Sequence, residues 1–121
     1  MKITRSADAP EAPFEADTFD GAVRRQDYGT VDAPRGTVFH VRFPAGARTH
    51  WHSHPGGQVL YVTEGTGSVG TRDGVIDTIR PGDLVVAPPG EVHWHGAAAD
   101  AEVRHLALSF GPTEWFEAVE P

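Results

Sequence analysis

The residues best suited to chemistry are the histidines, which gather in two short clusters. His52 and His54 lie two residues apart in "THWHSHPGGQ", and His93 and His95 repeat that spacing in "GEVHWHGA". Side chains two residues apart in an extended strand project from the same face. Neutral imidazole is the commonest metal ligand, and a transition-metal ion needs three or four donors that converge from separate strands. The two clusters therefore predict a metal site inside a β-barrel, where separate strands surround one interior.

A third strand is expected to add another histidine to this interior. In "VRHLALS" the alternation of side chains places His105 on the same face as Ala107 and Ser109. Imidazole exchanges protons near neutral pH, so His95 and His105 are the candidate catalytic residues. His95 would act as a general base or acid beside the metal, or as a hydrogen-bonding partner of a ligand. His105 would act as a substrate contact or a proton shuttle.

Other side chains are expected to shape the interior without taking part in chemistry. His40 alternates with apolar neighbours in "TVFHVRF", so it is expected to face away from the interior. His50 is expected at the mouth of the barrel. Phe39, Val41 and Leu60 are expected to be core packing or to shape a small apolar pocket for an aromatic aldehyde, and Thr49 could contribute a hydroxyl to substrate binding.

Positioning these side chains requires a fold made of many short strands. Runs rich in β-branched and aromatic residues recur along the chain, and 14 glycines and 10 prolines punctuate them. The runs cover residues 21–28, 37–43, 58–65, 67–74, 75–80, 83–89 and 101–110. Asp73-Gly74 predicts a hairpin turn, and "RPGD" at residues 80–83 predicts a second tight turn. This density of strands predicts an all-β sandwich or barrel, with one short helical turn over residues 113–119.

Length, charge and composition narrow the class of protein further. A chain of 121 residues fits one domain, and we expect a loose arm over residues 1–13 before a single domain over residues 14–121. The net charge of −7 argues against nucleic acid or an anionic membrane as a partner. The absence of cysteine excludes disulfides and thiolate ligands. No apolar run is long enough for a transmembrane helix, and residues 1–19 lack the apolar core of a signal peptide, so a cytoplasmic protein is expected.

The spacing of the two histidine clusters resembles the two sequence motifs of the cupin family of small β-barrels. The first motif, G-x5-H-x-H-x3,4-E-x6-G, is matched over residues 46–65 by Gly46, His52, His54, Gln58 and Gly65. The second motif, G-x5-P-x-G-x2-H-x3-N, is matched over residues 82–97 by Gly82, Pro88, Gly90 and His93. Two positions depart from the motifs: Gln58 stands where the family usually has Glu, and Ala97 replaces the final Asn.

This resemblance implies a cupin-type jelly-roll β-barrel whose interior holds one divalent metal ion. It implies that the ligands of the ion are His52, His54, Gln58 and His93. A narrower similarity, carried by "GARTHWHSHPGGQ", "GEVHWHGAA" and "TEWFEAV", is to the small bacterial cupins that include manganese-dependent hydroxynitrile lyases. Manganese is then the implied ion, with Fe, Zn, Ni or Co as alternatives, and a homodimer is the implied assembly.

The glutamine in the first motif bears on the type of reaction. Three neutral imidazoles and a neutral amide would leave the positive charge of a divalent ion undiminished, whereas a carboxylate would reduce it. Such a site suits redox-neutral work at a carbonyl better than oxygen chemistry, which needs higher oxidation states. The expected function is therefore a metal-dependent lyase that acts on a small-molecule carbonyl compound or cyanohydrin. The alternatives are a quercetinase-like dioxygenase and a cupin that binds a metal or small molecule without turnover.

Overall fold

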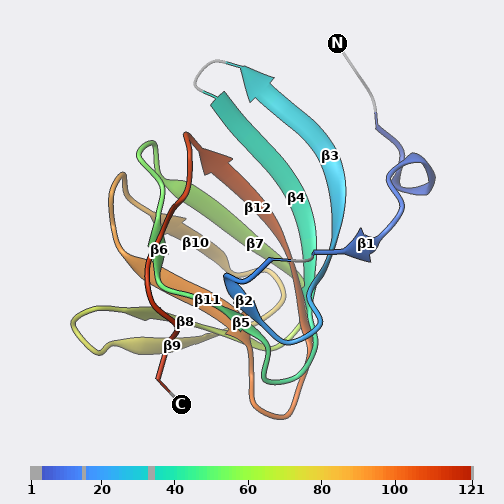
Figure 1. Cartoon of the computed structure of the whole chain (residues 1–121). Coiled ribbons are helices and arrows are strands. Elements are labelled where there is room, and N and C mark those ends of the chain that lie inside the picture. The colour runs from blue at the N-terminus through green and yellow to red at the C-terminus, as the bar shows by residue number, and fades with distance from the viewer. Residues whose placement is uncertain (1–3, 15, 33–34, 121) are drawn as a thin grey trace.

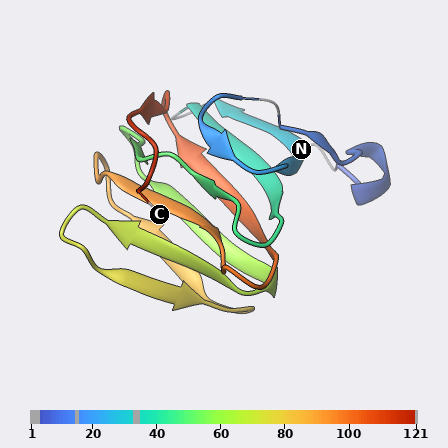
Figure 2. The same cartoon turned by 60° about the horizontal axis from the view of Figure 1, so that its bottom comes forward.

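Two curled antiparallel sheets make up the described part of the chain and form a half-barrel (Figure 1 and Figure 2). The computed structural model describes residues 4–14, 16–32 and 35–120. The first sheet contains, in spatial order, β1 (Ala12–Pro13), β3 (Arg24–Asp32), β4 (Arg35–Phe43), β12 (Val103–Phe110), β7 (Gln58–Gly65) and β10 (Leu84–Ala87). The second sheet contains β13 (Glu114–Trp115), β6 (His52–Ser53), β11 (His93–Ala97), β5 (Arg48–Thr49) and β2 (Phe19–Asp20), and β11 also pairs with β8 (Gly67–Thr71), which pairs with β9 (Ile76–Ile79). A short 3-10 helix, η1 (Ser6–Asp8), precedes the strands.

Side chains alternate between the two faces along each strand, and the face turned to the interior is buried. In β12 every second residue from Val103 to Ser109 is buried, and the residues between them are partly exposed. The apolar ones, Val103 and Ala107, belong to a core that also contains Val23, Val41, Phe43, Ala47, Leu60, Val62, Ile79 and Ala97. Phe43 joins this core to the histidines, because its ring centroid lies 5.7 Å from that of His95 and 5.5 Å from that of His105. The apolar core therefore supports the candidate site directly.

The all-β prediction is confirmed, and each strand-like run of the sequence overlaps an observed strand. The hairpin predicted at Asp73-Gly74 joins β8 to β9, and the Gly74 N–H donates to the Thr71 carbonyl at 3.0 Å. The "RPGD" turn is also present, with the Asp83 N–H donating to the Arg80 carbonyl at 2.9 Å. Period-two alternation and turn residues were therefore sufficient to locate these elements.

The helical turn predicted for residues 113–119 is wrong. These residues are extended, and β13 pairs with β6 through the partners Glu114–Ser53 and Trp115–His52. Local preference for a helix is a weak effect that tertiary pairing overrides. Here the strand pairing places the Trp115 ring 5.6 Å from the Phe19 ring, a packing contact that a helical turn would not form in the same way.

The described part of residues 1–13, which were predicted to be a loose arm, contacts the first sheet. β1 pairs with β3, the Ala9 side chain is buried, and the Gln26 amide donates to the Ala9 carbonyl at 2.8 Å. Glu11 accepts a hydrogen bond from the Arg24 guanidinium at 2.8 Å. The division into residues 1–13 and 14–121 stays a prediction. Among the described residues, no helix has the length and apolarity needed to cross a membrane.

Gly65 ends β7 in a backbone conformation that has no room for a side chain. Its φ is +79°, and a Cβ there would lie 2.0 Å from the Glu102 carbonyl oxygen. We expect Gly65→Ala to lower the free energy of unfolding by about 3 kcal/mol or more, since the backbone must move. Gly46 has a φ of +80° with open space around it, so Gly46→Ala should cost only about 1 kcal/mol. Urea denaturation of both variants measures the difference, and equal losses would contradict this prediction.

Candidate metal centre

Four imidazole rings meet on the inner side of the second sheet. His52 on β6 and His93 on β11 are directly paired across the strands, so both side chains project from one face. Their ring centroids lie 4.5 Å apart, and the rings of His54 and His95 each lie 5.1 Å from that of His52. All four side chains are buried. The two clusters that are 41 residues apart in sequence, counted from His52 to His93, therefore form one site.

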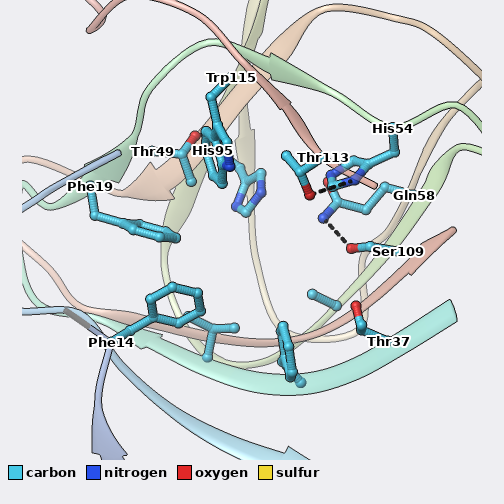
Figure 3. Close-up of a pocket in the computed structure, with 13 residues that line it drawn as sticks. Phe14, Phe19, Thr37, Thr49, His54, Gln58, His95, Ser109, Thr113 and Trp115 are labelled. Atoms are coloured by element: carbon cyan, nitrogen blue, oxygen red, sulfur yellow. Dashed lines mark hydrogen bonds between the residues drawn. The ribbon is translucent and has the colours of Figure 1, made fainter. Parts of the chain in front are cut away.

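Gln58, at the start of β7, brings an amide oxygen to the same place. Its Oε1 lies 2.8 Å from Nε2 of His93, while its Nε2 donates to the Ser109 hydroxyl at 2.9 Å (Figure 3). In this arrangement the amide oxygen faces the histidines and the amide nitrogen faces Ser109. Among the described residues, Nε2 of His54 is buried and has no hydrogen-bond partner. The structure thus brings together all four side chains that the cupin resemblance implies as ligands.

The tightest group of donor atoms differs by one residue from the implied ligand set. Ring nitrogens of His52, His93 and His95 all lie within 4.8 Å of one another, and this group could hold a metal ion. However, Nδ1 of His95 already lies 3.2 Å from Nε2 of His105. His54 offers a free, buried Nε2 instead. Among the described residues, His54 therefore offers an unpartnered donor atom to the site, whereas Nδ1 of His95 is in contact with His105.

Backbone carbonyls fix the tautomers of two of the rings. Nδ1 of His52 lies 2.9 Å from the His50 carbonyl, and Nδ1 of His93 lies 3.0 Å from the Glu91 carbonyl. A carbonyl oxygen only accepts, so Nδ1 carries the hydrogen in both rings and Nε2 of each neutral ring keeps its lone pair. Two acceptors, Nε2 of His93 and Oε1 of Gln58, then face each other at 2.8 Å. A cation bound at this point would remove that repulsion, so the residues fit a divalent metal ion.

Burial keeps the rings in the neutral state that metal binding requires. It lowers the pKa of His52 to about 3 and that of His54 to about 4, and the nearby His93 adds to both shifts. Burial also lowers the pKa of His93, and it lowers that of His95 well below its ordinary value. Since only an unprotonated nitrogen can bind a metal, these rings are ready to bind one at neutral pH.

His95 and His105 form a buried pair beside the site. The separation of 3.2 Å between Nδ1 of His95 and Nε2 of His105 fits one shared hydrogen. The backbone N–H of His95 donates to the Thr49 hydroxyl at 3.2 Å, and this hydrogen bond links β11 to β5. His95 lines the pocket described below, whereas His105 is fully buried behind it. His95 therefore connects His105 to the pocket through this contact.

The burial of His105 should make the stability of the metal-free protein depend on pH. Burial lowers the pKa of His105 from its ordinary 6.5 to about 4. Below pH 6.5 the unfolded chain takes up a proton at this residue and the folded chain does not, so the free energy of unfolding falls with falling pH. The loss from His105 alone should reach about 2 kcal/mol by pH 5. Urea denaturation with a chelator should give a weaker pH dependence for His105→Gln than for the wild type, and an unchanged dependence would contradict the prediction.

A small cavity of about 80 Å³ opens beside the histidines (Figure 3). Its lining combines an apolar wall with polar groups of the site: Phe14, Phe19, Thr37, Phe39, Val41, Thr49, His54, Gln58, His95, Ala107, Ser109, Thr113 and Trp115. Of the predicted substrate-binding residues, Phe39, Val41 and Thr49 line this cavity, whereas Leu60 is buried in the core and does not. His40 points elsewhere, with Nδ1 3.1 Å from the Gln26 amide oxygen and Nε2 2.9 Å from the Thr63 hydroxyl.

Several pocket residues had no place in the sequence prediction. The position of Ser109 in the pocket could have been predicted, because Ser109 shares the buried face of β12 with His105. The positions of Phe14, Phe19 and Trp115 could not, since these residues come from short strands or loops near the two ends of the chain. Thr113 lies 3.3 Å from Nδ1 of His54, a contact between residues 59 positions apart.

The jelly-roll arrangement and the buried histidines define a cupin. The profile of the cupin domain matches residues 39–109, and the chain belongs to the cupin family. It is 40% identical to an (R)-mandelonitrile lyase of Granulicella tundricola, over 98% of this chain and 95% of that protein. A cupin-like protein of Thermotoga maritima is 42% identical, with a TM-score of 0.84 over 90% of this chain and 86% of that one. An acetylacetone dioxygenase of Acinetobacter johnsonii shares the fold, with a TM-score of 0.77 at 18% identity over 97% and 78% of the two chains.

Proposed function

We propose that this cupin is a manganese-dependent lyase that cleaves an aryl cyanohydrin into an aldehyde and hydrogen cyanide. The observation that carries the proposal is a neutral donor set, His52, His54, Gln58 and His93, beside a small and largely apolar pocket. The similarity to an (R)-mandelonitrile lyase over nearly the whole chain supports the same reaction class. A divalent ion held by these four residues would supply Lewis acidity, stabilising the oxyanion or cyanide that develops as the bond breaks.

The chain's own residues account for the movement of protons. The pocket-facing nitrogen of His95 is the group placed to take the hydroxyl proton of a bound cyanohydrin, and the hydrogen on its Nδ1 can then shift toward Nε2 of His105. As the carbonyl forms, the carbon–carbon bond to the nitrile breaks and cyanide leaves with the bonding electrons. His95 then returns the proton to cyanide, so no oxidant or reductant is needed. The Thr49 hydroxyl lines the pocket beside His95 and can hydrogen-bond the substrate oxygen.

The amide of Gln58 favours this redox-neutral reaction over the dioxygenase alternative. An amide adds no negative charge to the ligand set, so an anion in the pocket would be attracted more strongly than beside a carboxylate. A higher oxidation state of the ion would be stabilised less for the same reason. The aromatic side chains of the pocket, Phe14, Phe19, Phe39 and Trp115, suit a substrate with an aryl ring.

The test is release of benzaldehyde from racemic mandelonitrile at mildly acidic pH, above the spontaneous rate. Metal-free protein is compared with protein loaded separately with Mn, Fe, Zn, Ni or Co. Turnover that is highest with manganese supports the proposal. Absence of turnover with every metal would overturn the lyase assignment, and oxygen uptake with flavonols or diketones would then decide for the dioxygenase. If the protein binds metal but shows neither lyase nor dioxygenase activity, the remaining assignment is a cupin that binds its ligand without turnover.

We further propose that the protein is cytoplasmic and forms a homodimer through the outer face of the first sheet. Tyr61 on β7 and Leu84 on β10 are directly paired, so they share the face that Val86, Leu106 and Leu108 also occupy. Tyr61, Leu84 and Val86 are exposed to 42%, 60% and 64%. Covering such a face gains hydrophobic free energy. We expect sedimentation equilibrium to give the mass of a dimer for the wild type and that of a monomer for Leu84→Glu; a monomeric wild type would contradict this.

A further inference from the structure

The last described segment of the chain, residues 113–120, runs beside β6, and we refer to it as the C-terminal strap (Figure 1). Its strand β13 pairs with β6, which places Trp115 directly opposite His52. Thr113 and Trp115 both line the pocket, and Thr113 also contacts His54 (Figure 3). The strap therefore contacts two of the four proposed metal ligands.

The indole of Trp115 forms part of the pocket wall and is still partly open to solvent. Its ring centroid lies 4.8 Å from that of His52 and 5.6 Å from that of Phe19. The residue nevertheless remains 36% exposed. A ligand ring placed against the indole would remove apolar surface from water, so Trp115 can select for substrates that carry such a ring.

The strap is held from the outer side of the sheet, away from the pocket. The Phe116 N–H donates to the Trp51 carbonyl at 2.8 Å, and the Trp51 N–H donates to the Glu117 carbonyl at 3.1 Å. The Glu117 carboxylate pairs with Arg72, whose guanidinium stacks 4.3 Å from the centroid of the Trp51 ring. Both partners of the ion pair are well exposed, so the pair is a modest attachment that a substitution can loosen without unfolding the barrel.

We propose that Trp115 determines specificity for aryl over alkyl substrates, and that Arg72 is a positioning residue that holds Trp115 through Glu117. The inference rests on the proposed lyase function for the identity of the reaction, but the aryl contact itself needs no turnover. Phe14 and Phe19 complete an aromatic wall with the indole, and their own ring centroids lie 4.6 Å apart. An aliphatic substrate cannot form these ring contacts, so the preference for the aryl substrate should be roughly three- to tenfold.

Two variants at the pocket wall and one control test Trp115. Trp115→Leu removes the ring but keeps an apolar side chain in β13, and Trp115→Phe keeps a ring. The control, Trp94→Phe, makes a Trp-to-Phe change at a buried tryptophan that does not line the pocket. Calorimetry compares benzyl alcohol with propan-2-ol on manganese-loaded protein, and kinetics compare mandelonitrile with acetone cyanohydrin. Trp115→Leu should weaken benzyl alcohol binding and lower the aryl preference by roughly three- to tenfold, with propan-2-ol unchanged. Trp115→Phe should lie between it and the wild type, and Trp94→Phe should match the wild type.

Arg72 is tested by the way in which the kinetic constants change. Arg72→Gln should raise KM for mandelonitrile and leave kcat and metal content unchanged, and Arg72→Lys, which can still pair with Glu117, should restore the wild-type KM. A fall in kcat or in metal content instead would overturn the positioning role. Benzyl alcohol binding by Trp115→Leu that stays within about twofold of the wild type would overturn the specificity role. If no protein turns over a cyanohydrin, the lyase proposal fails by itself, and the calorimetric comparison still decides for or against Trp115.

Discussion

Replacing His52 by alanine should abolish both metal binding and turnover. The ring is buried, its Nε2 lone pair points into the site, and three other proposed ligands surround it. Loss of a residue that only supports a metal ligand typically costs ten- to a hundredfold in affinity or activity, so loss of a ligand should exceed about a hundredfold. Metal content after dialysis, measured by elemental analysis, and kcat/KM for mandelonitrile check this expectation.

His50→Ala is the matched control for that experiment. His50 lies two residues away and contributes its backbone carbonyl to His52, and a carbonyl is retained in alanine. The control should therefore keep its metal and most of its activity. A His52→Ala protein that keeps its metal would show that the ion is held elsewhere, and the proposed ligand set would have to be abandoned.

His95→Gln should lower kcat by about a hundred- to ten-thousandfold while metal content stays at the wild-type level. The expectation follows from the position of His95, which lines the pocket and has its Nδ1 next to His105. Removal of a general acid–base group has typical effects of this size. Glutamine keeps the side-chain volume and a hydrogen-bonding group but cannot exchange a proton at neutral pH. Single-turnover kinetics on the metal-loaded variant separate this loss from any weaker binding of substrate.

His105→Gln provides the comparison that distinguishes a shared proton from a simple packing role. It should lower kcat less than His95→Gln does, because His95 lines the pocket whereas His105 contacts His95 from behind it. It should also change the pH profile of kcat, since the partner that shares the proton is gone. If His95→Gln instead loses its metal, His95 is a ligand, as the cluster of His52, His93 and His95 would allow.

The strands and the histidine cluster could be predicted from sequence because both depend on short-range periodicity. Alternation in β12 identified the inward face of His105 and Ser109, and the two H-x-H spacings identified pairs of rings on one face. The amide of Gln58 was predicted by its motif position, and the structure places that amide against His93. None of these inferences needed to know which strands are neighbours.

The pocket mouth could not be predicted because it depends on pairings between distant parts of the chain. β13 is two residues long, and only its pairing with β6 makes Trp115 a wall of the pocket instead of part of a helical turn. Leu60 failed as a pocket residue for a related reason. It occupies an inward position on β7, but the depth of a residue along a barrel interior is set by the register between strands. Periodicity gives the face of a strand and leaves that depth undetermined.

The carbonyls that orient His52 and His93 come from residues 50 and 91, each two positions before its histidine. A carbonyl belongs to the backbone, so a substitution at either position keeps the acceptor whatever side chain is introduced. The orientation of these two rings therefore depends on the backbone at residues 50 and 91. A change of side chain at either of those residues does not remove the hydrogen-bond acceptor. In a complete mutational scan, positions 52 and 93 should therefore be intolerant, while positions 50 and 91 should accept most amino acids other than proline.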